Sequence, residues 1–212
     1  MEKKYNIIYA DPPWQYRSGA VQGAAKNHYP TMSDDELYRL PVGEMADEEA
    51  VLFLWATFPK LPEAFRLIES WGFRYKTVAF VWVKQNPSGN GFFLGLGWWT
   101  RGNAEICLLA TKGKPRRKSA KISQLVISPR MEHSWKPEQV RELIVELAGD
   151  LPRIELFARQ KTDGWDVWGN EVPCDIEMKG CEGNGLCSGS ERSDQSENEG
   201  HVQSDKEAAD LL

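Results

Sequence analysis

A carboxylate, two prolines and an aromatic ring follow one another directly in the segment Asp11-Pro12-Pro13-Trp14. The exocyclic amine of adenine is a poor nucleophile, because its lone pair is delocalised into the ring. Two hydrogen-bond acceptors on its N–H groups would make that nitrogen more tetrahedral and more reactive. Asp11 can supply a carboxylate acceptor, and Pro12 a carbonyl that no strand ladder needs. Trp14 offers a flat apolar face on which a purine can stack.

The position of this segment agrees with such a role. It follows the apolar run Tyr5 to Ala10, which predicts a buried strand that the two prolines end. In an open α/β sheet, ligands bind beyond the carboxyl ends of the strands. The alternative is a proline-rich turn with Trp14 in the core, and it suits an isolated Pro-Pro-Trp better than one placed directly after a strand.

The elements that must position this segment alternate between strand and helix patterns, which predicts an α/β fold. Further strands are expected at 51–55, 75–83, 105–111, 125–127 and 154–157, and helices at 33–40, 62–71 and 137–148. Ser33 and Glu36 have the spacing of a capping box. Residues 85–103 hold five glycines and predict a long functional loop, and residues 164–170 predict a Trp-rich turn.

Charge divides the chain into two parts. Residues 171–212 carry 11 acidic and 3 basic side chains, whereas residues 1–170 carry 20 and 23, so the net charge of −5 arises in the tail. The tail is rich in Gly, Ser, Glu, Asp and Asn, which predicts disorder. We therefore expect a domain over residues 1–173 and a disordered acidic tail over 174–212. The body remains compatible with a polyanionic partner.

A basic run follows the expected strand at 105–111. Its side chains are either a solvated loop or contacts to nucleic-acid phosphates, and the candidates for phosphate contact are Lys112, Lys114, Arg116, Arg117 and Lys118.

Other classes of protein are disfavoured. No run of about 18 apolar residues predicts a membrane span, and no signal peptide is evident, so a cytoplasmic protein is expected. Cys174, Cys181 and Cys187 lack the paired spacing of zinc sites, and His28 and His133 show no metal spacing. We expect no metal site.

Several separate motifs together resemble the MT-A70 family of adenine methyltransferases, from Asn6 to Glu171. They are DPPW (11–14), Tyr29 followed by TMSDDE (31–36), LFLW (52–55), WGF (71–73), WVK (82–84), Trp98-Trp99 with Asn103-Glu105, HSWKPE (133–138), IELFAR (154–159) and Gly169-Asn170. The resemblance implies a Rossmann-like S-adenosylmethionine-dependent methyltransferase fold. It also implies the permuted, β-class motif order, with the catalytic motif first and most of the cofactor-binding motif near the end.

The resemblance also implies roles for individual residues. The catalytic set comprises Asp11, Pro12, Pro13 and Trp14, with Tyr29 lining the acceptor pocket. The set that binds S-adenosylmethionine comprises Asp11, Lys136 at the cofactor carboxylate, Glu155 and Arg159 near the ribose, Asn170 and Glu171. Lys161 and Thr162 depart from the His-Asn of the eukaryotic enzyme, so the ribose contacts are expected to differ.

The implied reaction is methyl transfer from S-adenosylmethionine to the N6 amine of adenine in nucleic acid. DNA is favoured, because a compact domain without an added RNA-binding module resembles the bacterial and phage members. An RNA adenine-N6 methyltransferase and a non-catalytic nucleic-acid-binding subunit are the alternatives. Asp11, Trp14 and Lys136 are all present, which favours the enzyme. Homodimer and heterodimer both stay open.

Overall fold

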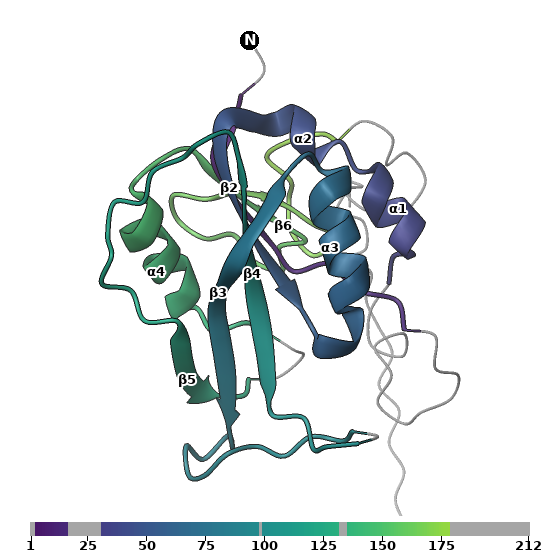
Figure 1. Cartoon of the computed structure of the whole chain (residues 1–212), viewed down its shortest axis with the longest axis vertical. Coiled ribbons are helices and arrows are strands. Elements are labelled where there is room, and N and C mark those ends of the chain that lie inside the picture. Colours follow the sequence, from purple (N-terminus) through teal and green to yellow (C-terminus); the bar gives the residue numbers. More distant parts are fainter. Residues whose placement is uncertain (1–2, 17–30, 98, 132–134, 179–212) are drawn as a thin grey trace, which may run out of the picture.

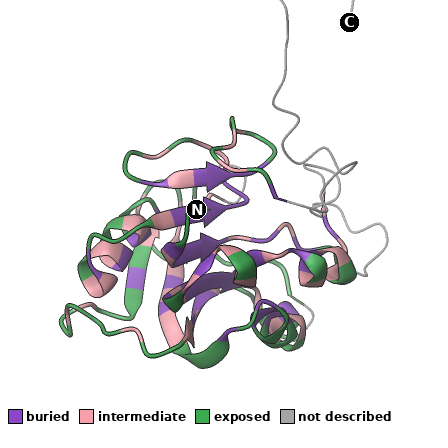
Figure 2. Ribbon diagram, turned by 90° about the horizontal axis from the view of Figure 1, so that it is seen from above, coloured by how far each residue is buried: buried purple, intermediate pink, exposed green. Residues whose placement is uncertain are grey.

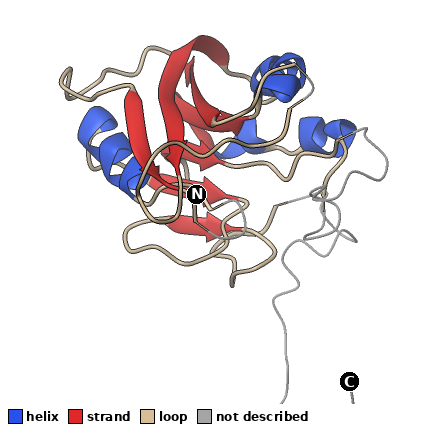
Figure 3. Ribbon diagram, turned by 90° about the horizontal axis from the view of Figure 1, so that it is seen from below, coloured by secondary structure: helices blue, strands red, loops and turns tan. Residues whose placement is uncertain are grey.

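A computed structural model describes residues 3–16, 31–97, 99–131 and 135–178. One curled seven-stranded sheet forms the centre, with α4 on one face and α1, α2 and α3 on the other (Figures 1 and 3). The expected α/β fold is confirmed, and it is consistent with that of S-adenosylmethionine-dependent methyltransferases. No described helix combines the length and apolar character needed to cross a membrane.

The elements follow one another in an order close to the one expected. They are β1 (Tyr5–Ala10), α1 (Asp34–Arg39), α2 (Val42–Met45), β2 (Ala46–Ala56), the short 3₁₀ helix η2 (Phe58–Lys60), α3 (Leu61–Ser70), β3 (Arg74–Gln85), β4 (Ala104–Lys112), β5 (Leu125–Pro129), α4 (Gln139–Ala148), β6 (Arg153–Leu156) and β7 (Asp166–Trp168). The strand order across the sheet is β5-β3-β4-β2-β1-β6-β7, and every strand is parallel to its neighbours except β4.

Local chemistry explains where the first helices begin and end. At α1, the Ser33 hydroxyl accepts the Glu36 backbone N–H and the Glu36 carboxylate accepts the Ser33 N–H, so the expected capping box is confirmed. α3 has Pro62 in its first turn and is followed by Gly72 at φ 79°.

Two apolar cores lie on the two faces of the sheet. One gathers Leu37, Leu67 and Ile68 of the α1/α3 side against alternate residues of β1 and β2. The other packs Val140 and Ile144 of α4 against the opposite residues of the same strands. Because both faces are covered, β1 apart from Asn6 and residues 52–56 of β2 are buried, and Figure 2 shows the middle of the sheet largely in the colour of buried residues. Cys107 is fully buried in the second core.

The structure differs from the sequence expectation at the end of the domain. Residues 166–168 form strand β7, not a turn, because they pair in parallel with β6 and place Trp168 in the core. Composition groups residues 174–178 with the tail, but in the structure they contact the domain. The Asp175 carboxylate accepts the Val167 N–H at 2.7 Å, and Met178 is buried. The remainder of the expected disordered tail, 179–212, lies outside the described residues.

Candidate active site

One edge of the sheet gathers the candidate site residues. All strands but β4 end at this edge, and β4 begins there because it runs antiparallel (Figure 3 looks toward this edge). Asp11 follows β1, Glu105 is the second residue of β4, and the segment before α4 brings Lys136 to the same place. Residues far apart in the chain thus meet beyond the strand ends.

Asp11, Glu105, Lys136 and Lys84 form an ionic cluster at this edge. The Lys136 ammonium donates to Asp11 Oδ2 at 2.6 Å and lies 3.4 Å from Glu105 Oε2, and Lys84 pairs with the other Glu105 oxygen. The Lys136 side chain is only 9% exposed, whereas Asp11 is 26% exposed. The cluster therefore pairs the nearly buried Lys136 ammonium with the Asp11 carboxylate, which solvent can reach.

Charges within the cluster stabilise one another. Burial by itself would lower the pKa of Lys136, but Asp11 and Glu105 outweigh it and hold that pKa above its ordinary value. Burial would likewise raise the pKa of Glu105, yet Lys136 and Lys84 keep it below the usual range. Lys136 and Glu105 are therefore both ionised at neutral pH, and the cluster can meet both an anionic and a cationic ligand group.

The DPPW segment is held rigidly around Asp11. The Pro12 carbonyl accepts the Trp14 N–H at 2.8 Å, and the Pro13 carbonyl accepts the Met32 N–H at 3.0 Å. A carbonyl oxygen has two lone pairs, so Pro12 can still accept a second donor. Trp14 is 5% exposed, and its indole donates to the Trp55 carbonyl at 3.2 Å. Its ring therefore packs in the core, as in the alternative interpretation of this motif as a proline-rich turn.

A second polar network lies beside the cluster on the α4 face. Both Glu155 oxygens accept from Arg141 at 2.7 Å, and the Arg141 guanidinium lies 5.8 Å from the centre of the Tyr9 ring. The Tyr9 hydroxyl accepts the Trp55 indole N–H at 2.7 Å, and Lys136 sits 5.5 Å from the Trp55 ring centre. Burial raises the pKa of Glu155, although Arg141 opposes the shift. The network ties Glu155 to the site while engaging its carboxylate.

The chain is strained just beyond β6. Phe157 has a φ of 62°, which is uncommon for a residue with a large side chain and is typical of functional sites. A Cβ atom on Gly169 would lie 2.2 Å from the Ala158 carbonyl oxygen, so only glycine fits there. Arg159 and Glu171 approach to 3.8 Å near this turn. The expected cofactor residues after β6 and β7 are therefore close to one another.

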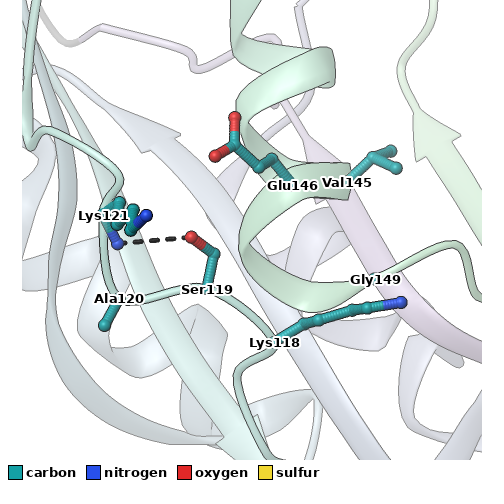
Figure 4. A pocket seen from close by; sticks show the side chains of 7 residues that line it. All are labelled: Lys118, Ser119, Ala120, Lys121, Val145, Glu146 and Gly149. Atoms are coloured by element: carbon teal, nitrogen blue, oxygen red, sulfur yellow. Dashed lines mark hydrogen bonds between the residues drawn. The ribbon is translucent and has the colours of Figure 1, made fainter.

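Other expected site residues lie elsewhere. Tyr29 falls outside the described residues. The basic run starts at the opposite edge, because β4 ends there, and the Lys112 ammonium donates to the Gly43 and Ala46 carbonyls. Further along, Lys118 and Lys121 line an open hollow of about 590 Å³ with Glu146 at the end of α4 (Figure 4). A helix C-terminus and a carboxylate weaken any attraction for phosphate in this hollow.

Comparison with known proteins agrees with this geometry. A family model described as MT-A70 matches residues 5–171. The chain belongs to the MT-A70 family. Its MT-A70 domain thus spans β1 to the segment after β7, which includes the whole candidate site.

Individual MT-A70 relatives differ in how much of their length corresponds to this chain. The type II methyltransferase M.MunI from a Mycoplasma species is 39% identical over 194 residues, covering 81% of this chain and 79% of that protein. The human N(6)-adenosine-methyltransferase catalytic subunit METTL3 is 27% identical over 173 residues, covering 80% of this chain but 28% of its own length. A putative N(6)-adenosine-methyltransferase from Medicago truncatula is 30% identical, with 26% of its length covered. These relatives support adenine-N6 methyl transfer as the reaction class.

Sequence reasoning gave no role to three charged residues of the candidate site. Glu105 and Lys84 stand at the two ends of the segment between β3 and β4, and both lie inside recognised motifs. Arg141 looked like an ordinary residue on the polar side of an amphipathic helix. A charged residue at the end of an otherwise apolar strand was the available signal for Glu105. No sequence signal paired Arg141 with Glu155.

Proposed function

We propose that this MT-A70 protein transfers the methyl group of S-adenosylmethionine to the N6 amine of adenine in nucleic acid, with DNA favoured over RNA. The observation that carries the proposal is the ion pair between Lys136 and Asp11. Asp11 directly follows β1 and is the first residue of the DPPW segment. It combines an accessible carboxylate with a buried ammonium where an α/β sheet binds ligands.

The residues at this edge fit S-adenosylmethionine, which presents a carboxylate, an ammonium, a ribose and a sulfonium. Lys136 would hold the carboxylate as a point charge, and Asp11 would face the positive groups. Glu155 has lone pairs beyond those used by Arg141 and would accept from ribose hydroxyls. Arg159, Asn170 and Glu171 would border the remainder of the molecule. When bound, the cofactor supplies a methyl group on positively charged sulfur.

Asp11 and Pro12 would prepare the target amine. The Asp11 carboxylate accepts one N–H of the adenine amine, and the Pro12 carbonyl accepts the other with its second lone pair. These hydrogen bonds orient the nitrogen lone pair and strengthen as positive charge develops on that nitrogen. Lys136 pairs with Asp11 and is itself held by Glu105, so the ion pairs fix the direction of the Asp11 carboxylate. Pre-positioning of this kind lowers the barrier without moving the protein.

The preference for DNA rests on identity to the relatives. The type II methyltransferase M.MunI, which acts on DNA, is 39% identical to this chain, whereas the N(6)-adenosine-methyltransferases from Medicago truncatula and human are 30% and 27% identical. Because the target amine is paired inside a duplex, activity on DNA requires either base flipping or a single-stranded substrate. RNA is the alternative substrate.

A methyl-transfer assay with labelled S-adenosylmethionine on duplex DNA, single-stranded DNA and RNA tests the proposal. Transfer to adenine-containing DNA, lost when adenine is replaced, is expected. Lys136→Ala should raise the dissociation constant for S-adenosylmethionine about ten- to hundredfold in calorimetry, through loss of a charge-assisted contact. Absence of transfer to all three nucleic acids would refute the enzyme and favour a non-catalytic binding subunit.

A further inference from the structure

The described residues between β3 and β4, 86–97 and 99–103, form an extended arm at the candidate active-site edge. It runs beyond the strand ends along the lower side of the molecule (Figure 1). Backbone hydrogen bonds hold it at its base and middle, from Lys84 to the Asn103 carbonyl at 2.9 Å and from Gly95 to the Gly102 carbonyl at 2.7 Å. A Cβ atom on Gly95 would meet that Gly102 oxygen, so this close approach requires glycine. These contacts give the arm a defined backbone conformation.

Large apolar side chains of the arm face solvent. Phe92, Leu94 and Leu96 are 56%, 60% and 75% exposed, and Trp99 is 99% exposed. Phe93 and Gly95 between them are only half-buried, so the exposure alternates as in an extended chain whose alternate residues point one way. An apolar row of this size on a soluble protein marks a binding surface.

The charges around this row identify its partner. Residues 86–104 contain no Asp or Glu and one Arg, Arg101, which is exposed. Exposed Arg130, from the segment after β5, places its guanidinium 4.3 Å from the centre of the Phe93 ring. Aromatic rings interleaved with arginines, without a carboxylate among them, suit a polyanion whose bases stack.

The arm is also continuous with the candidate site. Its last residue precedes β4, whose second residue, Glu105, contacts Lys136 beside Asp11. A strand lying along the arm would therefore lead directly to Asp11. The basic run at the opposite edge has no such continuity.

We propose that the arm docks the unpaired nucleic-acid strand next to the target adenine. Trp99 and Phe92 stack on its bases, Leu94 and Leu96 cover the apolar faces left open when the adenine leaves the stack, and Arg101 and Arg130 face its phosphates. This inference rests on the proposed function and deepens it, because it names unstacked single strand as the form the protein recognises.

Fluorescence anisotropy with a labelled adenine-containing single-stranded oligonucleotide, and with its duplex, tests the arm. Trp99→Ala is expected to weaken single-strand binding about five- to hundredfold, the range for a lost base–aromatic stack. The salt dependence should stay unchanged, because no phosphate contact is lost. Leu96→Ala should weaken binding in the same direction. Leu151→Ala, an exposed leucine before β6 at the opposite edge, is the matched control and should bind like the parent.

Sedimentation of the same variants shows whether the arm binds a second copy of this chain and not a nucleic-acid strand. If Trp99→Ala changes the mass of the particle but not its affinity for the strand, the arm contacts a second copy of this chain and the proposal is overturned. Unchanged affinity with unchanged mass overturns it as well. The methyl-transfer assay on the parent distinguishes failure of the arm proposal from failure of the proposed function. A parent that methylates the strand while Trp99→Ala binds it normally refutes only the arm. A parent without transfer refutes the proposed function.

Discussion

Replacing Lys136 by Met keeps a long unbranched side chain and removes the ammonium from the ionic cluster. Removing one partner of a buried ion pair typically costs about 3–5 kcal/mol. Lys136 is nearly buried, but Asp11 is 26% exposed and Glu105 retains Lys84, so both carboxylates keep some solvation or pairing. We expect a loss of about 2–3 kcal/mol in the free energy of unfolding at pH 7, below that range. For a chain of this size, that lowers Tm by roughly 4–12 °C.

The pH dependence of the free energy of unfolding tests the electrostatic origin of this loss more directly. In the parent, the lowered pKa of Glu105 contributes stability above its unfolded pKa of about 4.3, and this is lost as pH falls through the folded pKa. The raised pKa of Lys136 contributes stability below its unfolded pKa of about 10.4, lost as pH rises through the folded pKa. The cluster's contribution is therefore level from about pH 5 to 10. In the variant, Glu105 loses one of the two ammonium groups that lower its pKa while its burial remains, so its carboxyl protonates at a higher pH than in the parent.

Urea unfolding of parent and variant at pH 5, 7 and 9 measures this difference. The gap between them should be widest at pH 7 and 9 and narrow at pH 5. Lys114→Met, at an exposed lysine of the basic run, should lie within about 0.5 kcal/mol of the parent at each pH. A Lys136→Met protein as stable as the parent at pH 7, or a gap that does not change with pH, would refute the electrostatic reasoning.

Three further outcomes are expected. Asp11→Ala should reduce single-turnover methylation of an adenine-containing strand about hundred- to thousandfold, with some activity retained by Asp11→Asn and a cooperative circular-dichroism melt as the folding control. Arg141→Met should lower the free energy of unfolding in urea by about 3–5 kcal/mol at pH 7, because Glu155 loses both hydrogen bonds. The loss should be smaller at lower pH, where the Glu155 carboxyl protonates, and an equal loss at pH 7 and at lower pH would contradict this reasoning. A chain ended after Pro173 should be roughly 1.5–3 kcal/mol less stable than one ended after Met178, which is buried, and equal melting of the two would show that the intervening residues do not stabilise the domain.

The sequence predicted most of the elements of this fold, because period and capping are local properties. The apolar run at Tyr5, the capping box at Ser33 and the amphipathic pattern before Gly149 each placed an element within a few residues of its observed bounds. The strand β7 escaped prediction, since three residues carry too short a pattern. It forms because β6 offers its edge.

The residues of the candidate site also divide into those that the sequence predicted and those that only the tertiary structure brings together. The sequence by itself determined the DPPW segment after a strand and, through resemblance, predicted Lys136 as a second candidate site residue. Only the tertiary structure decided that β4 runs antiparallel between β2 and β3. That one reversal brings Glu105 to Lys136 and sends the basic run to the opposite edge. Hydrophobic periodicity reports which side of a strand is buried but not which strand lies beside it, and ion pairs depend on that neighbour.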